Sequence, residues 1–294
     1  MNNSTFLDAL KSGRRIVSDG ATGTNLIARG LPHGTTAENW VLEQPEQIVR
    51  LHQEFITAGA DLILTSTFGA TSLRLAGSSL DGRVVEVNQR AVQLARQAAG
   101  NSKVWVAGSL GPVGGLLKPY GPLEVQAVTQ SYAEQAHALA EAGVDLLAIE
   151  TQFDLGEAKA AIQGVRSVTG LPLVCSFSYD RGRRTMMGLS PTQAARQLAE
   201  LAIDAIGINC GRSLEENLQN LVELRQATSL PIWFKPNAGL PHIDEQNRTS
   251  YSTIPAEMGA QAIAWLEAGA QVIGGCCGTS PEHLAQIALA IKPA

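Results

Sequence analysis

The sequence alternates from end to end between apolar runs of strand length and amphipathic stretches of helix length. Eight apolar runs occur, at residues 15–18, 61–65, 104–108, 146–150, 172–176, 205–209, 231–235 and 270–274. Near-continuous apolar runs are typical of parallel strands buried on both faces. Eight alternations over 294 residues predict a single-domain α/β fold, a (β/α)8 (TIM) barrel spanning residues 1–294. A doubly wound open sheet is the alternative fold.

The expected helix boundaries carry signals of their own. Asp154 and Ser213 each precede a glutamate by three positions, which is the spacing of a capping box. Ser190 and Ser280 each stand directly before a proline, and this order suits the first turn of a helix. These signals support helices between the predicted strands.

Composition excludes several classes of function. The net charge is −5 and lysines and arginines form no cluster, so we expect no nucleic-acid partner. No apolar window is long enough to cross a membrane, and the first residues show no basic stretch followed by an apolar one, so we expect no signal peptide. Four cysteines without framework spacing fit a reducing cytosol. We therefore expect a cytoplasmic protein that does not bind membranes.

Three cysteines stand where apolar runs stop and glycines begin, namely Cys210 and the adjacent pair Cys276 and Cys277. Neighbouring residues of a regular strand point to opposite faces, so the strand must break for both members of the pair to reach one ion. Glycines on either side of the pair permit such a break. Three thiolates with an open fourth position are the pattern of a catalytic zinc site.

The barrel places these cysteines together, because active sites of such barrels lie at the C-terminal ends of the strands. Cys210 follows the sixth predicted strand and Cys276 the eighth. A thiol is the natural ligand for the open position of a sulfur-rich site, which indicates alkyl transfer to sulfur. Core packing of the cysteines and a disulfide remain alternatives. Cys175, inside an apolar run, is interpreted as a packed core cysteine.

Other polar residues are expected at the same rim: Asp19, Gly20, Thr65, Glu150 and Asn237. Two carboxylates near an anionic site suggest a cationic ligand group such as an amino-acid ammonium. Backbone amides of the loop around Gly20 could hold its carboxylate. Capping, turn formation and structural hydrogen bonds are the alternative roles of these residues.

Lys235 ends the seventh apolar run. A catalytic role and a solvated position beside a loop are both open to it, and from the sequence we expect the solvated position.

Six ordered motifs are recognisable, and they cover nearly the whole chain. They are Asp19-Gly20-Ala21-Thr22-Gly23-Thr24, Thr65-Ser66-Thr67-Phe68-Gly69-Ala70-Thr71, Ile149-Glu150-Thr151, Gly207-Ile208-Asn209-Cys210, Pro236-Asn237-Ala238-Gly239 and Gly274-Gly275-Cys276-Cys277-Gly278-Thr279. Together they resemble the homocysteine S-methyltransferase family. The sequence looks closest to the homocysteine-binding barrel of cobalamin-dependent methionine synthase.

The resemblance implies roles for individual residues. Cys210, Cys276 and Cys277 correspond to the family's zinc ligands. Asp19 and Glu150 correspond to the residues that bind the homocysteine amino group. Thr65 matches a substrate-contacting threonine, and Gly20, Asn209 and Asn237, which lie inside family motifs, are expected at the substrate site.

The function implied by the resemblance is zinc-dependent transfer of a methyl group to homocysteine, forming methionine. The donor is expected to be a small sulfonium or ammonium compound such as S-methylmethionine or betaine, or a methyl-corrinoid on a separate protein. No Asp-x-His-x-x-Gly corrinoid motif occurs, so we expect the methyl group to be supplied freely. Alternatives are methylation of another thiol, demethylation of another compound, or a zinc- or thiol-binding barrel without turnover.

Overall fold

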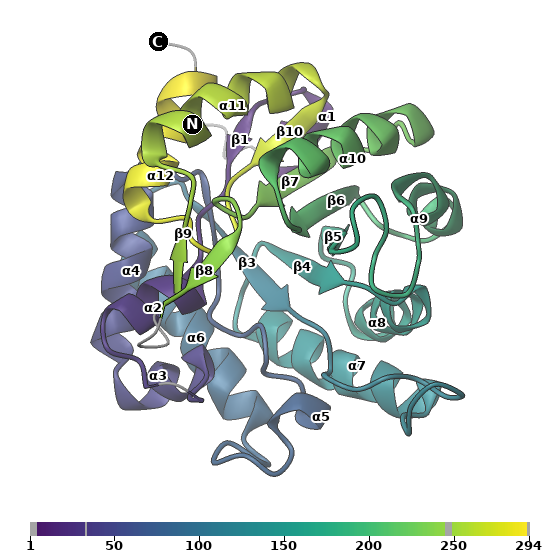
Figure 1. Ribbon diagram of the computed structural model, residues 1–294. Coiled ribbons are helices and arrows are strands. Elements are labelled where there is room, and N and C mark those ends of the chain that lie inside the picture. The colour runs from purple at the N-terminus through teal and green to yellow at the C-terminus, as the bar shows by residue number, and fades with distance from the viewer. Residues whose placement is uncertain (1–4, 33, 245–248, 293–294) are drawn as a thin grey trace.

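Eight parallel strands form the centre of the molecule in the computed structural model, which describes residues 5–32, 34–244 and 249–292. The strands are β1 (Ile16–Val17), β2 (Leu62–Leu64), β3 (Trp105–Leu110), β4 (Leu146–Gln152), β5 (Leu173–Phe177), β6 (Ala205–Cys210), β7 (Ile232–Pro236) and β10 (Ala270–Ile273). Their order in the sheet is β1-β10-β7-β6-β5-β4-β3-β2 (Figure 1). Each lies within two residues of its predicted run.

The two end strands of this sheet meet and close it into a barrel. Ser18 forms a parallel bridge with Leu62, and the Asp61 amide donates to the Val17 carbonyl at 2.7 Å. The predicted (β/α)8 barrel is therefore confirmed, and the open doubly wound sheet is excluded.

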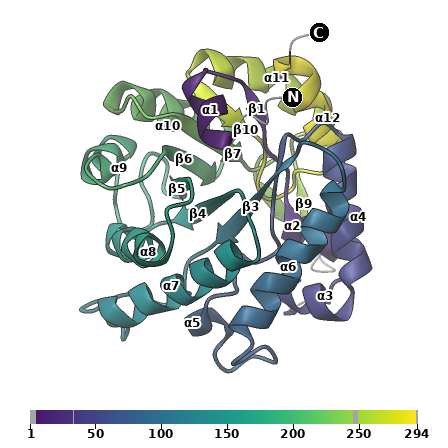
Figure 2. The ribbon, with the colours of Figure 1, turned by 180° about the vertical axis from the view of Figure 1, so that it is seen from behind.

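Helices surround the barrel (Figures 1 and 2). The outer ring consists of α4 (Pro45–Thr57), α6 (Val84–Ala99), α7 (Val125–Glu141), α8 (Leu155–Val168), α9 (Pro191–Leu198), α10 (Leu214–Ala227), α11 (Pro255–Glu267) and α12 (Pro281–Ile291). The predicted caps are confirmed: Asp154 accepts from the Gly156 and Glu157 amides, Ser213 from Glu216 and Ser190 from Gln193, and Ser280 is the N-cap of α12.

Further elements extend the eightfold pattern. They are α1 (Phe6–Lys11), α2 (Thr22–Ala28), α3 (Ala37–Glu43), α5 (Ser72–Leu75), and an antiparallel hairpin of β8 (Pro241–Ile243) and β9 (Thr249–Tyr251). The hairpin lies on the near side of Figure 1, where the strands end, while α1 lies on the far side and faces the viewer in Figure 2. No helix in the described part of the chain is long and apolar enough to span a membrane.

The interior of the barrel changes character along the strands. Toward the N-terminal ends of the strands, the interior is an apolar cluster of alternate strand residues packed against α1. Its members are Phe6, Ala9, Leu10, Ile16, Leu62, Leu64, Ala107, Leu146, Ala148, Val174, Ala205, Trp233 and Val272. Gly207 makes room for Trp233, because a Cβ there would overlap it. Side chains two positions further along β4 and β7 are Glu150 and Lys235. Since side chains alternate along a strand, these polar groups continue the inward-facing rows at the C-terminal end.

Candidate metal and substrate site

The three rim cysteines converge at the C-terminal end of the barrel. The Sγ atoms of Cys210, Cys276 and Cys277 all lie within 4.8 Å of one another. Cys210 Sγ and Cys276 Sγ are 2.9 Å apart, which is longer than a disulfide bond of about 2.05 Å, and all three are free thiols. Cys175 is buried in the layer between strands and helices, as predicted, and burial raises the pKa of its thiol.

Irregular backbone brings the cysteines together. Strand β10 ends at Ile273, so the predicted break before the cysteine pair is confirmed. Cys210 itself is left-handed, with φ of 59°, a conformation that costs a non-glycine residue about 1 kcal/mol or more. Hydrogen bonds hold this turn: Asn217 Nδ2 and the Asn237 amide both donate to the Cys210 carbonyl, at 2.8 and 3.2 Å.

The three thiols hydrogen-bond one another, and a bound cation could take the place of the shared protons. Hydrogen bonds with Cys210 and Cys276 lower the pKa of the Cys277 thiol well below its usual value, while hydrogen bonds with Cys276 and Cys277 raise the pKa of the Cys210 thiol. The cluster therefore contains one sulfur that readily carries negative charge and neighbours that lose protons when a metal binds. Three soft donors with no fourth member of the group among the described residues fit a soft divalent ion with an open position.

A tyrosine from the hairpin covers the cysteine loop. The Tyr251 hydroxyl hydrogen-bonds the Cys277 sulfur. Its ring lies directly on Gly278, where φ is 81° and a Cβ would overlap the ring. Sequence reasoning missed this contact, because nothing in the local pattern around Tyr251 predicts which strand end the hairpin will cover.

Asn209 and Asn237 connect the strand ends and do not line the cavity described below. Asn209 is fully buried; its Oδ1 accepts from the Thr151 amide at 2.8 Å and from Ser176 Oγ at 2.6 Å, and its Nδ2 donates to Thr151 Oγ1 at 2.6 Å. Asn237 Nδ2 donates to the Gly211 carbonyl at 2.7 Å. Both asparagines therefore fix the backbone that carries Cys210.

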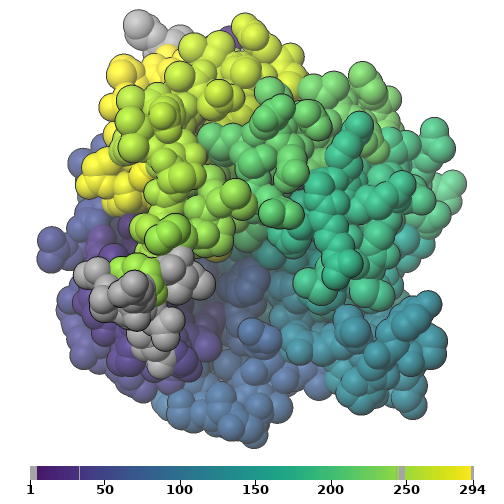
Figure 3. Space-filling view, viewed as in Figure 1, coloured from purple at the N-terminus to yellow at the C-terminus, as the bar shows by residue number. Residues whose placement is uncertain are grey.

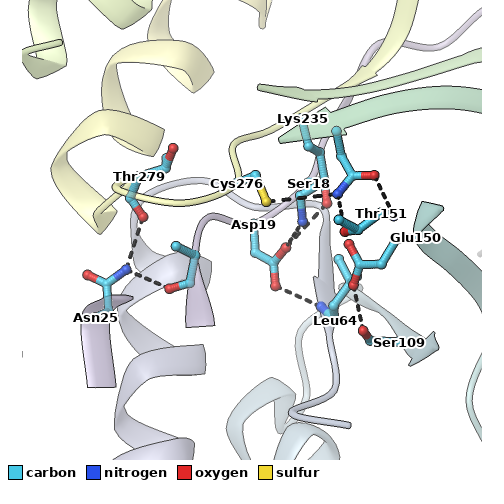
Figure 4. A network of polar contacts seen from close by, with 12 residues as sticks. Ser18, Asp19, Asn25, Leu64, Ser109, Glu150, Thr151, Lys235, Cys276 and Thr279 are labelled. Atoms are coloured by element: carbon cyan, nitrogen blue, oxygen red, sulfur yellow. Dashed lines mark hydrogen bonds and ion pairs between the residues drawn. The ribbon is translucent and has the colours of Figure 1, made fainter. Parts of the chain in front are cut away.

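A buried ion pair lies beside the cysteines (Figure 4). Lys235 Nζ donates to Asp19 Oδ1 at 2.6 Å, and the two side chains are 4% and 1% exposed. Asp19 Oδ2 accepts from the Leu64 amide at 2.7 Å. The expected solvated position of Lys235 is therefore wrong. Its side chain points into the barrel because it stands two positions after the buried Trp233, and Asp19 compensates its charge.

Glu150 ends the inward row of β4 and is 8% exposed. Ser109 Oγ donates to its Oε1 at 2.5 Å. Burial raises the pKa of Glu150 to about 7, although the Lys235 charge acts in the opposite direction. Burial also works against the charge of Lys235, but Asp19 and Glu150 raise its pKa above the usual value. Lys235 is thus positively charged at neutral pH.

Thr65 and Gly20 lie at the wall of the same region. Thr65 Oγ1 is 2.7 Å from Thr67 Oγ1 and accepts from the Ser109 amide at 3.1 Å. Gly20 has no space for a side chain, because a Cβ would lie 2.6 Å from both a Phe55 ring carbon and the Thr279 carbonyl oxygen. The loop after β1 therefore packs closely against α4 and the loop after β10.

A cavity of about 670 Å³ opens above these groups, a size that suits a small-molecule site. The predicted residues that line it are Gly20, Thr65, Glu150, Cys210, Cys276 and Cys277, with Lys235 and Ser109 in addition. Asp19 is not a lining residue and reaches the cavity through Lys235. Figure 3 shows the face from which the hairpin projects, and this face is hollowed near its centre.

Fold and site together define a (β/α)8 barrel with a cluster of three thiols at its C-terminal rim. The chain belongs to the homocysteine S-methyltransferase family, whose family model matches residues 16–291. The resemblance seen in the six motifs is thereby confirmed.

Individual relatives agree with this family. Methionine synthases of Mycobacterium tuberculosis and Mycobacterium leprae are each 31% identical over 97% and 95% of this chain. The chain spans about a quarter of their length, 25% and 24%. The homocysteine methyltransferase MmuM of Escherichia coli is 28% identical, and the match covers 98% of this chain and 99% of that chain with a TM-score of 0.82 for the metallated form.

Proposed function

We propose that this protein transfers a methyl group to the thiol of homocysteine and so forms methionine. The observation that carries the proposal is the position of the three clustered thiols at a cavity that Glu150 also lines. A sulfur-rich metal site and a buried carboxylate together suit a ligand that has both a thiol and an ammonium group. The family and the E. coli relative, a homocysteine methyltransferase, support the same substrate.

Cys210, Cys276 and Cys277 would hold a zinc ion. A zinc ion held there would supply a Lewis acid that favours the deprotonated, nucleophilic form of the substrate thiol. The substrate sulfur then forms a bond to the methyl carbon while the bond between methyl and donor breaks, and the bonding electron pair leaves with the donor.

The chain's own groups orient the substrate. Glu150 accepts the ammonium group, and Ser109 fixes one oxygen of that carboxylate. Thr65 and the backbone at Gly20 form the neighbouring wall. Asn209 and Asn237 keep the Cys210 turn in place, and Asp19 lies beneath the cavity, where it pairs with Lys235.

The methyl donor enters from the open end of the cavity. We propose a freely supplied donor, either a small compound such as S-methylmethionine or betaine or a methyl-corrinoid delivered by a separate protein. The four free thiols suit a reducing compartment, from which we infer a cytoplasmic location.

The test is methionine formation by the zinc-loaded protein. Homocysteine is incubated separately with S-methylmethionine, betaine and methylcobalamin, and methionine is measured by mass spectrometry, with zinc-stripped protein as the control. Methionine from at least one donor, lost on zinc removal and restored by zinc, is the expected result. Stoichiometric zinc without turnover of any donor would instead identify a binding protein, and turnover of a different thiol with homocysteine inert would reassign the substrate.

A further inference from the structure

The charges at the cavity floor include one cation that the proposed chemistry has not used. Lys235 lines the cavity, although its side chain is only 4% exposed. An ammonium group has three N–H donors, and Asp19 Oδ1 accepts one of them. Among the residues that the structure describes, no second acceptor lies within hydrogen-bond distance of Nζ. Donors of Lys235 are therefore left for a ligand.

Asp19, in contrast, has its oxygens occupied. Oδ1 accepts from Lys235 Nζ and, at 3.4 Å, from Ser18 Oγ, while Oδ2 accepts from the Leu64 amide. Because Asp19 is also buried beneath the cavity wall, it acts as the counter-ion that keeps Lys235 charged in a site shielded from water. A charged lysine without such a partner would be costly to bury.

Glu150 and Lys235 form a pair of opposite charges next to the thiols. They belong to β4 and β7, which the sheet order separates by β5 and β6, so they face one another across the barrel interior. Each interacts electrostatically with the other and with the Cys276 sulfur. A ligand whose sulfur lies at the cysteines can therefore present an anionic group to Lys235 and a cationic group to Glu150.

We propose that Lys235 binds the α-carboxylate of the thiol amino-acid substrate and that the site thus selects its substrate by both charges. This inference rests on the proposed function, since it concerns the thiol substrate of the same site. It makes Lys235 a specificity residue, with Asp19 as its positioning residue. A charge-assisted hydrogen bond in such a shielded place contributes about 10-fold to 100-fold in affinity.

Truncated ligands test each charge separately. Calorimetry on the zinc-loaded protein measures the dissociation constants of homocysteine, of 3-aminopropane-1-thiol, which lacks the carboxylate, and of 4-sulfanylbutanoate, which lacks the amino group. For Lys235→Met we expect homocysteine and 4-sulfanylbutanoate to bind about 10-fold to 100-fold more weakly, while 3-aminopropane-1-thiol changes less than about threefold. Glu150→Gln should give the reciprocal pattern, weakening the two thiols that carry an amino group.

Two further variants keep the test decisive. The single variant Lys235→Met leaves the buried Asp19 carboxylate without its counter-ion, which can prevent folding. Asp19→Asn combined with Lys235→Met removes both charges of the pair, and we expect this double variant to show the same pattern of ligand affinities. Lys292→Met is the matched control, because Lys292 also pairs with an aspartate, Asp61 at 3.0 Å, but lies outside the cavity lining; its binding constants should equal those of the wild type.

These measurements distinguish the role of Lys235 from the methyl-transfer activity itself. Equal weakening of all three thiols in the Lys235 variants, or no weakening, overturns the carboxylate-binding role, while methionine formation by the wild type upholds the proposed function. Wild-type protein that binds none of the three thiols overturns the proposed function and this inference together.

Discussion

Asn209 joins the end of β6 to Thr151 at the end of β4 through two hydrogen bonds, one to the Thr151 amide and one to its hydroxyl. The residue after Asn209 is Cys210, and both Thr151 and Cys210 are left-handed, with φ of 61° and 59°. The asparagine therefore holds two unfavourable backbone conformations in place next to the thiol cluster.

Replacing Asn209 by alanine should loosen the Cys210 turn. We expect zinc affinity to fall about 10-fold to 100-fold, the range found when groups that orient metal ligands are removed, together with a loss of about 1–3 kcal/mol in the free energy of unfolding. Competition with a chelator measures the first and urea unfolding the second. Asn220→Ala is the control: Asn220 is also fully buried and donates to a backbone carbonyl, that of Gly182. If both variants retain zinc equally, Asn209 has no special role at the metal site.

Cys210→Ser and Cys276→Ser should each abolish methyl transfer while the barrel remains folded. A protonated hydroxyl removes both a charge and a soft donor from the metal site, whereas the apolar core remains intact. Zinc content, circular dichroism and methionine formation measure the three effects. Cys175→Ser should keep zinc and activity and lose roughly 1 kcal/mol or more of stability. A Cys276→Ser protein with full zinc and turnover would refute the assignment.

Glu150→Gln should be more stable than the wild type at alkaline pH. In the folded protein the pKa of Glu150 is raised from 4.5 to about 7. Between these values the unfolded chain releases its proton and the folded chain does not, so Glu150 lowers stability progressively as pH rises from about 4.5 to 7, and the full loss persists above 7. Glutamine does not ionise, so we expect the variant to be about 1–3 kcal/mol more stable at pH 8 and similar to the wild type at pH 4.

Urea unfolding of zinc-free wild type and variant at both pH values measures this difference. A constant difference between the two proteins across the range would mean that Glu150 ionises normally.

Gly278→Ala should displace Tyr251 and weaken zinc binding. The substitution meets the Tyr251 ring at a position where φ is also left-handed. Gly182→Ala isolates the backbone contribution, because Gly182 has φ of 66° with no neighbouring atom within 4 Å of an added Cβ, and should cost about 1–2 kcal/mol. Zinc titration and thermal unfolding compare the two. Equal effects would show that the contact with Tyr251 does not support the cysteine loop.

The fold was predictable because each buried parallel strand is a short apolar run, and each of the eight runs coincides with a strand. The rim cysteines were predictable for the same reason, since a barrel brings strand ends together. The solvated position predicted for Lys235 was wrong, because the prediction considered the charge of the side chain and not the face of the strand on which it lies. Trp233 and Lys235 share one face of β7, just as Ala148 and Glu150 share one face of β4, so the alternation contained the information.

The partners of these residues were not predictable. Asp19 accepts hydrogen bonds from Lys235 and from the Leu64 amide. These contacts depend on the closure of β1 against β2 and on the position of β10 between β1 and β7. The hairpin was missed because β8 and β9 have only three residues each and show no apolar run of strand length.

The wide spacing of the thiols along the chain sets an order of events in the cell. Translation makes Cys210 long before Cys276 and Cys277, and β10, which precedes the pair, must insert between β1 and β7 before all three sulfurs meet. A nascent chain therefore does not offer the metal all three thiols together until β10 is in place. Metal acquisition thus marks completion of the barrel, and partly made barrels should compete poorly for cellular zinc.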